Sequence, residues 1–187
     1  MNLPNRITVL RVLMIPIVVI LMEVPNHGAQ IAAAILFIIA ALTDLADGHI
    51  ARKRNLVTDF GKFLDPIADK LLVLGAMALL VEQTKMAGWV LLVYLAREFV
   101  ISAFRMIAAS SGTVIAAGPL GKFKTLLQSF AVPMLMLLKP LEGEVAMWGQ
   151  WGVVAADVVN YAAMVMAVIS CVDYILRNKH IMKEWKM

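Results

Sequence analysis

The sequence has little charge and almost no cysteine. Charged residues make up 16% of the 187 positions, whereas a soluble domain usually has about a quarter. Hydrophobic residues make up 61%, and the mean hydropathy is +0.83. Cys171 is the only cysteine, which excludes an internal disulfide, and the three histidines show no metal-ligand spacing. With so few charges to cover a surface, the chain is predicted to be an integral membrane protein.

Six apolar runs fill most of the chain, and each is close to or longer than the roughly 20 residues that cross a bilayer. Short segments rich in turn-forming residues separate the runs, and there is no obvious repeat. Because lipid cannot satisfy the backbone of an open strand, we expect an all-α bundle of six transmembrane helices, forming one domain over residues 1–187. The expected spans are residues 7–25, 29–50, 66–83, 87–109, 120–139 and 146–176.

Basic residues gather at one end of the expected spans. They lie at the chain start, at the second-to-third and fourth-to-fifth connections and in the C-terminal tail, and only Lys85 and Lys139 fall near the opposite ends. The positive-inside rule then places both termini in the cytoplasm. Trp89, Trp148 and Trp151 lie near the other ends, as an aromatic belt would. The net charge of +4 therefore needs no nucleic-acid partner.

A dense group of carboxylates follows the second apolar run, in the stretch "TDLADGHIARKRNLVTDFGKFLDPIADK". Asp44 and Asp47 are three residues apart, and Asp65 and Asp69 are four apart, so each pair shares one helix face. A reversal between the two helices would aim all four carboxylates at one point. Four like charges repel unless a cation lies among them, and a set of oxygen ligands favours Mg²⁺ or a similar hard ion.

The carboxylates also have a plainer explanation. Asp44 and Asp47 would merely end one helix, and Asp65 would cap the next. Anions at a helix C-terminus oppose its dipole, however, and ionisable residues next to lipid are candidates for function. We therefore favour the metal site. Asp59 is expected to be a solvated residue of the connecting loop.

The spacing of this stretch resembles the signature of the CDP-alcohol phosphotransferases. The signature covers eight positions within 26 residues, and the sequence matches it without a gap or a substitution. The segments "NLPNRITVLR", "AREF" and "GKFKT" resemble members of the family that use glycerol 3-phosphate as the acceptor. The matching signature positions are Asp44, Asp47, Gly48, Ala51, Arg52, Gly61, Asp65 and Asp69.

The resemblance implies that the phosphatidyl group of CDP-diacylglycerol is transferred to sn-glycerol 3-phosphate and that CMP is released. It further implies two Mg²⁺ or Mn²⁺ ions, a homodimer, membrane lipids as surroundings, and a bacterial plasma-membrane location with the site facing the cytoplasm. Asp69 would be the general base. The implied metal ligands are Asp44, Asp47, Asp65 and Asp69. The implied donor-binding residues are Asn5, Thr8, Asp44, Gly48, Ala51 and Arg52. The acceptor would be bound by Arg97, Arg105, Lys122 and Lys124.

Several of these residues have alternative interpretations that the sequence leaves open. Asn5 is also a plausible helix cap, Arg52 a plain juxtamembrane arginine, and Arg97 one half of an ion pair with Glu98. Gly48 and Ala51 would also suit helix packing. Other acceptors, such as inositol phosphate or serine, fit the family. Two more remote alternatives for the function of the whole chain are a magnesium-dependent membrane prenyltransferase and a divalent-cation transporter.

Overall fold

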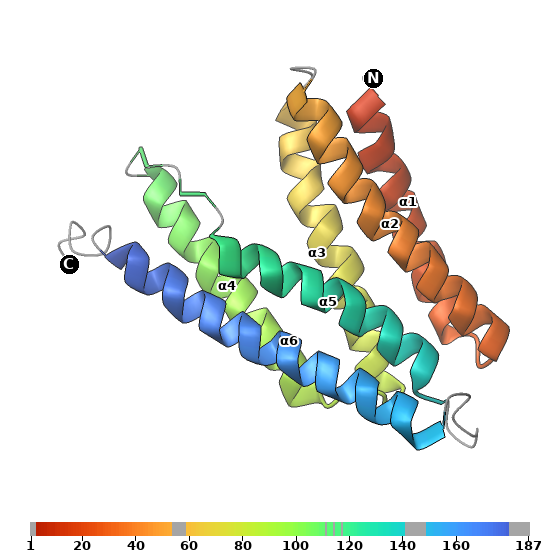
Figure 1. The fold of residues 1–187 in the computed structure, drawn as a ribbon. Coiled ribbons are helices and arrows are strands. Elements are labelled where there is room, and N and C mark those ends of the chain that lie inside the picture. Colours follow the sequence, from red (N-terminus) through yellow and green to blue (C-terminus); the bar gives the residue numbers. More distant parts are fainter. Residues whose placement is uncertain are drawn as a thin grey trace.

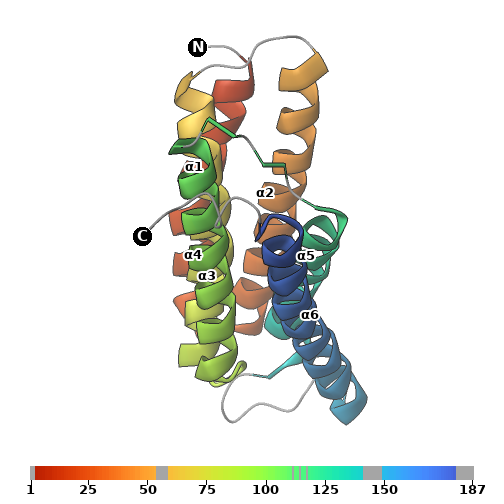
Figure 2. The same ribbon diagram turned by 90° about the vertical axis from the view of Figure 1, so that its left-hand side faces the viewer.

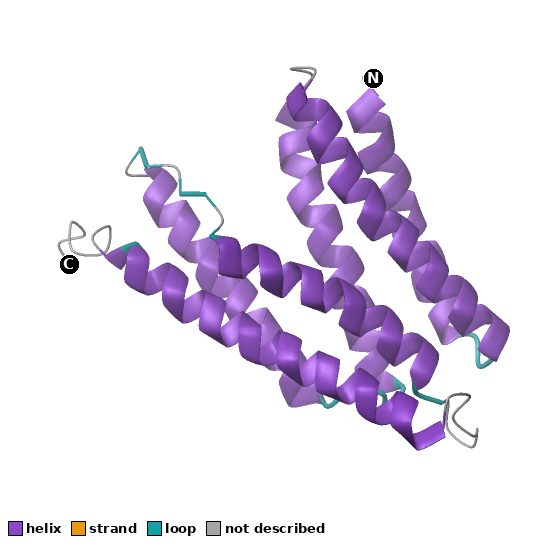
Figure 3. Cartoon of the chain, in the orientation of Figure 1, coloured by secondary structure: helices purple, strands orange, loops and turns teal. Residues whose placement is uncertain are grey.

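The computed structural model describes the backbone of residues 3–53, 59–110, 112–113, 115–116, 118–140 and 149–179, and their side chains except those of residues 3–7, 44–53, 59–63, 65 and 66. Every regular element in these ranges is a helix (Figure 3). The predicted all-α fold with six helices is confirmed. The helices are α1 (Leu3–Glu23), α2 (His27–Lys53), α3 (Asp59–Glu82), α4 (Gly88–Ser110), α5 (Pro119–Leu138) and α6 (Gly149–Arg177).

Two helix starts differ from the prediction. α3 begins at Asp59, seven residues earlier than expected, so the prediction that Asp59 belongs to a loop is wrong. The helix runs through both Gly61 and Pro66. An aspartate suits a helix start because it complements the dipole. α1 begins at Leu3, so Asn5 lies inside the helix and is not its cap.

The helices form two groups that diverge toward one end of the molecule (Figure 1). α1 packs against α2 and α3, while α6 packs against α4 and α5. α5 also packs against α2, and α3 against α4, which joins the groups. Successive helices alternate in direction, and the bundle is elongated (Figures 1 and 2). The diverging end therefore holds the C-terminal ends of α2, α4 and α6 and the N-terminal ends of α1, α3 and α5.

The opposite end is closed by a buried polar network. The Lys85 ammonium donates to Gln30 Oε1 at 3.2 Å and to the Met136 carbonyl at 3.3 Å. Gln30 in turn donates to the Met22 carbonyl at 2.7 Å. These bonds tie α1, α2 and α5 to the segment that follows α3. Because buried polar groups of this kind are costly to separate, the two helix groups are held together here and are free to diverge at the other end.

The bundle has an apolar core, exposes many apolar side chains on its outer faces and also buries several polar ones. On α4, Leu92, Phe99 and Met106 are spaced by seven residues and are 65%, 70% and 69% exposed. An apolar face of this kind is unfavourable in water and typical of contact with lipid. The buried polar side chains include Thr8, Arg11, Gln30, Lys85, Lys124, Gln128, Asn160 and Ser170. Polar groups that face the interior of an apolar bundle are usually functional or tightly paired.

Among the described residues, α6 alone is both long and apolar enough to cross a membrane by composition. The part of α2 from His27 to Thr43 is a shorter apolar segment. α4 contains the charged residues Arg97, Glu98 and Arg105, and α5 contains Lys122 and Lys124. These charges line an internal cavity, so they do not require those faces to be in water.

Candidate active site

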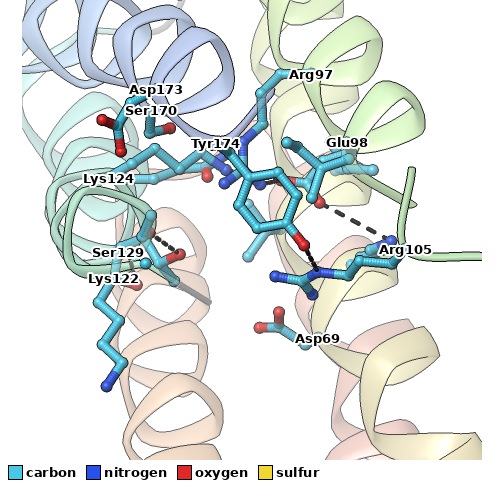
Figure 4. Close-up of a pocket in the computed structure, with 18 residues that line it drawn as sticks. Asp69, Arg97, Glu98, Arg105, Lys122, Lys124, Ser129, Ser170, Asp173 and Tyr174 are labelled. Carbon is cyan, nitrogen blue, oxygen red and sulfur yellow. Dashed lines mark hydrogen bonds and ion pairs between the residues drawn. The ribbon is translucent and has the colours of Figure 1, made fainter. Parts of the chain in front are cut away.

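A cavity of about 270 Å³ lies among the helices, next to the connection between α4 and α5. Residues of α3, α4, α5 and α6 line it (Figure 4). Five basic and three acidic side chains lie in this lining, which leaves an excess of two positive charges. The cavity therefore suits an anionic ligand, and a phosphate monoester carries about the same charge with opposite sign. The charged lining residues are Asp69, Lys70, Arg97, Glu98, Arg105, Lys122, Lys124 and Asp173.

Glu98 is the centre of an ion-pair cluster on one wall of the cavity. Its Oε1 atom accepts hydrogen bonds from Arg97 Nη1 at 2.5 Å and from Lys124 Nζ at 2.9 Å. Its Oε2 atom lies 3.9 Å from Lys70 Nζ, which donates to Ser102 Oγ at 2.7 Å. One carboxylate thus contacts basic side chains from α3, α4 and α5. The possible Arg97–Glu98 ion pair is present, and it extends beyond the two adjacent residues.

Lys122 and Lys124 lie in the first turns of α5, which begins at Pro119. Lys124 is buried, whereas Lys122 is exposed and extends away from Glu98 (Figure 4). Residues two apart on a helix face different directions, which explains the difference. Two lysines at a helix N-terminus oppose the helix dipole unless an anion joins them. Their position therefore favours a binding role over a simple surface role.

Arg105 is held by an aromatic residue of α6. Its Nε atom donates to the Tyr174 hydroxyl at 3.3 Å, and its guanidinium carbon lies 5.6 Å from the centre of the same ring. Tyr174 is buried and packs edge-on against Phe104, with 5.8 Å between the two ring centres. Because the ring has little freedom, the arginine is directed toward the cavity (Figure 4). A guanidinium in a fixed orientation is suited to bidentate binding of a phosphate.

Asp69 lies on α3 and lines the same cavity as these basic groups. It is half-buried, and it interacts electrostatically with Lys124 on α5. Five residues expected from the sequence are thereby brought to one cavity, namely Asp69, Arg97, Arg105, Lys122 and Lys124. A carboxylate beside a cationic cavity can take a proton from a ligand whose anionic group the cavity holds.

Arg97 has a buried donor with no hydrogen-bond acceptor among the described residues. The atom is Nε, while Nη1 is bonded to Glu98. Nη2 lies against α5, where a Cβ added to Gly121 would be 3.6 Å away. A buried polar atom without a partner costs about 1–3 kcal/mol, and such atoms deserve an explanation in a native structure. Here the arginine side chain is closely held between α4 and α5.

The predicted donor and metal residues are placed only in part. Asp44, Asp47, Gly48, Ala51 and Arg52 lie in the last turns of α2, and Asp65 lies near the start of α3. The two aspartate pairs thus lie on successive helices, as the spacing predicted. The side chains of these six residues and of Asn5 are outside the described part of the structure. Thr8 is buried on α1 and is not part of the cavity lining.

The predicted metal ligands share one type of donor atom. Among the described side chains, no three acidic, cysteine or histidine residues lie close enough together to hold a metal. Asp69 is the one predicted ligand with a described side chain. The complete predicted set offers carboxylate oxygens alone, which is the ligand type that Mg²⁺ and Mn²⁺ prefer. The residue types therefore fit the ions.

The sequence alone assigned no site role to Lys70 of α3 or to any residue of α6. In the structure Lys70, Ser170, Asp173 and Tyr174 all line the cavity. The signal was present, because "SCVDY" places polar groups within an otherwise apolar run, and such residues usually face the interior. Asp173 also accepts a 2.7 Å hydrogen bond from Arg177.

Comparison with known proteins shows the family of this chain. The family model for CDP-alcohol phosphatidyltransferase matches residues 1–169. A CDP-diacylglycerol–glycerol-3-phosphate 3-phosphatidyltransferase of Bacillus subtilis (strain 168) is 42% identical, with 97% of each chain covered. A protein of the same name from Rickettsia typhi is 40% identical, and the match covers 79% of this chain and 87% of the relative. Another from Escherichia coli (strain K12) is 41% identical, and the match covers 72% of this chain and 76% of the relative. The chain therefore belongs to the CDP-alcohol phosphatidyltransferase family.

Proposed function

We propose that this protein transfers the phosphatidyl group of CDP-diacylglycerol to sn-glycerol 3-phosphate, giving phosphatidylglycerophosphate and CMP. The observation that carries the proposal is the meeting of Asp69 with five basic side chains in one cavity. The names of the relatives, at about 40% identity over most of the chain, support the same donor and acceptor.

The acceptor would bind through its phosphate. Arg105 and Lys122 offer donors at the cavity surface, and Lys124 and Arg97 lie deeper beside Glu98. Charge-assisted hydrogen bonds of this kind are about twice as strong as neutral ones. They would hold the glycerol moiety with one hydroxyl toward Asp69, which would accept its proton.

The chemical step would be a displacement at phosphorus. Asp69 takes the proton of the acceptor hydroxyl, and the hydroxyl oxygen forms a bond to the phosphorus that carries the diacylglycerol. The bond from that phosphorus to the oxygen of CMP breaks, and CMP leaves with its electron pair. Asp44, Asp47, Asp65 and Asp69 would hold two Mg²⁺ or Mn²⁺ ions, which neutralise the pyrophosphate charge when bound.

The donor would enter from the membrane. Asn5, Thr8, Gly48, Ala51 and Arg52 would surround its nucleotide, near the ends of α1 and α2 that lie beside the diverging helices. The diacylglycerol tails would remain in lipid against the exposed apolar faces of the bundle.

All six helices would cross a bacterial plasma membrane, with the cavity and both termini on the cytoplasmic side. The described basic residues support this orientation, because most lie at the diverging end while Trp89 and Trp151 are exposed at the other. We further propose a homodimer in the membrane. The chain would then function as one membrane domain over residues 1–187.

The test is an acceptor screen on the purified full-length protein in mixed micelles with CDP-diacylglycerol and Mg²⁺. We expect CMP release to depend on added sn-glycerol 3-phosphate, with phosphatidylglycerophosphate identified as the product by mass spectrometry. Equal rates with inositol phosphate or serine would contradict the acceptor assignment. CMP release at the same rate with no acceptor would show that the protein hydrolyses its donor instead.

A further inference from the structure

We infer that Glu98 is a positioning residue that holds Arg97 and Lys124 together as one phosphate-binding pair. The inference rests on the proposed function, because it concerns the acceptor cavity. Glu98 lines that cavity, but it carries the same charge as the acceptor and so repels it. An acidic residue in such a place needs an explanation, and its contacts supply one.

The first observation is that both basic residues share a single oxygen of Glu98. Arg97 Nη1 and Lys124 Nζ bond to the same Oε1 atom, from α4 and α5 respectively. Two cations this close repel each other strongly in a site with little water. Their approach is therefore possible only with a negative charge between them, and Glu98 supplies it.

The second observation is how little freedom the cluster has. The side chain of Lys124 is 3% exposed, that of Arg97 13% and that of Glu98 18%. Lys124 also lies 5.5 Å from the ring centre of Tyr94, which is buried and donates from its hydroxyl to the Asn160 carbonyl at 3.2 Å. A lysine normally has a flexible stem with many rotamers. Here its ammonium is confined by an aromatic ring and a carboxylate.

The third observation is that the cluster joins three helices. Lys70 approaches the second oxygen of Glu98 from α3, the helix that carries Asp69 next in sequence. The carboxylate thus links the helix of the general base to the two helices that bind the acceptor phosphate. This link fixes the distance between the phosphate site and the base, and a reacting hydroxyl requires that kind of accuracy.

The direction in which Glu98→Gln changes the KM for glycerol 3-phosphate distinguishes a positioning role from a purely electrostatic one. Glu98→Gln removes a negative charge from the cavity, so electrostatics alone would lower the KM for glycerol 3-phosphate. If Glu98 positions Arg97 and Lys124, the same change releases them and raises this KM by about 10- to 100-fold. The KM for CDP-diacylglycerol should stay within about twofold of the wild-type value, because Glu98 is not one of the residues proposed to bind the donor.

The experiment measures initial rates of CMP release by the full-length protein while each substrate is varied separately. Asp157→Asn is the matched control, because Asp157 forms a 2.7 Å ion pair with Lys139 at the opposite end of the bundle. Glu98→Asp keeps the negative charge on a side chain that is one methylene group shorter. Its KM for glycerol 3-phosphate should therefore lie between those of Glu98→Gln and the wild-type protein. In the double variant Glu98→Gln/Lys124→Met, the KM should rise by less than the product of the two single effects, because part of the effect of Glu98 acts through Lys124.

A lowered or unchanged KM for glycerol 3-phosphate in Glu98→Gln would overturn the inference. Equal increases of KM for both substrates would overturn it too, because they indicate general damage. If Glu98→Gln loses its cooperative unfolding transition in detergent, Glu98→Asp decides the question, and an unchanged acceptor KM in that variant contradicts the inference. A failure of the proposed function is distinguishable, because the wild-type protein would then release no CMP on addition of glycerol 3-phosphate.

Discussion

The ammonium of Lys124 on α5 lies 2.9 Å from a carboxylate oxygen of Glu98 on α4, inside the cavity that also contains Asp69. This pair sets the character of the acceptor site. A buried lysine confined by a partner is a fixed charge, whereas Lys122, two residues earlier, is exposed to solvent. The two lysines of the "GKFKT" segment therefore have different environments, and substituting each should have different effects.

Replacing Lys124 with methionine should impair acceptor binding. The change removes one charge-assisted hydrogen bond, worth about 1.5–3 kcal/mol, so the KM for glycerol 3-phosphate should rise by about 10- to 100-fold. The KM for CDP-diacylglycerol should change little. Steady-state rates with each substrate varied in turn provide the measurement, and Lys139→Met, at the far end of the bundle, is the control. A larger effect on the donor would move Lys124 to the donor site.

Replacing Asp69 with asparagine should slow the chemical step. The amide has nearly the same shape as the carboxylate but cannot accept the proton, so kcat should fall by about 10²- to 10⁴-fold. Thermal stability in detergent should be nearly unchanged. Asp157→Asn is again the matched control, because its carboxylate lies outside the cavity. If Asp69→Asn retained the wild-type rate, another group would have to be the base.

The contact between Arg105 and Tyr174 consists of a hydrogen bond to the hydroxyl and a cation–π contact with the ring, and two substitutions can separate them. Tyr174→Phe removes the hydroxyl that accepts the 3.3 Å bond but keeps the ring, and Tyr174→Leu removes both. We expect the KM for glycerol 3-phosphate to rise modestly in the first variant, by about threefold to tenfold, and further in the second. Tyr161→Phe changes a tyrosine of the same helix that stacks on Trp89 away from the cavity, and it should behave like wild type. The reverse order of the Tyr174 variants would contradict the role of the ring.

Removing divalent ions should abolish turnover. Treatment with EDTA leaves the proposed carboxylate set unneutralised, so CMP release should cease and should return when Mg²⁺ or Mn²⁺ is added in excess. Asp44→Asn should shift the Mg²⁺ concentration for half-maximal activity upward by about tenfold or more, as expected for the loss of a charged ligand. Full activity in the presence of EDTA would exclude the two-metal proposal.

The sequence predicted the helices well because each long apolar run is separated from the next by turn-forming residues. The starts of α1 and α3 were misplaced because charged residues and glycine beside an apolar run resemble a loop. Of the cavity, Asp69 and the four basic acceptor residues were predicted, and they do lie together. The pairing of Lys124 with Glu98 could not be read from the sequence, since the two residues are 26 positions apart on different helices. For the same reason, nothing in the order of residues indicated that Tyr174 would orient Arg105.

The central claim is that the cavity beside Asp69 binds the acceptor by its phosphate. The most direct test compares sn-glycerol 3-phosphate with glycerol as acceptors for the wild-type protein, using CMP release from CDP-diacylglycerol as the readout. Several charge-assisted contacts, each of about 1.5–3 kcal/mol, predict that kcat/KM will be at least about a thousandfold higher for glycerol 3-phosphate. Comparable values for the two acceptors would contradict the claim.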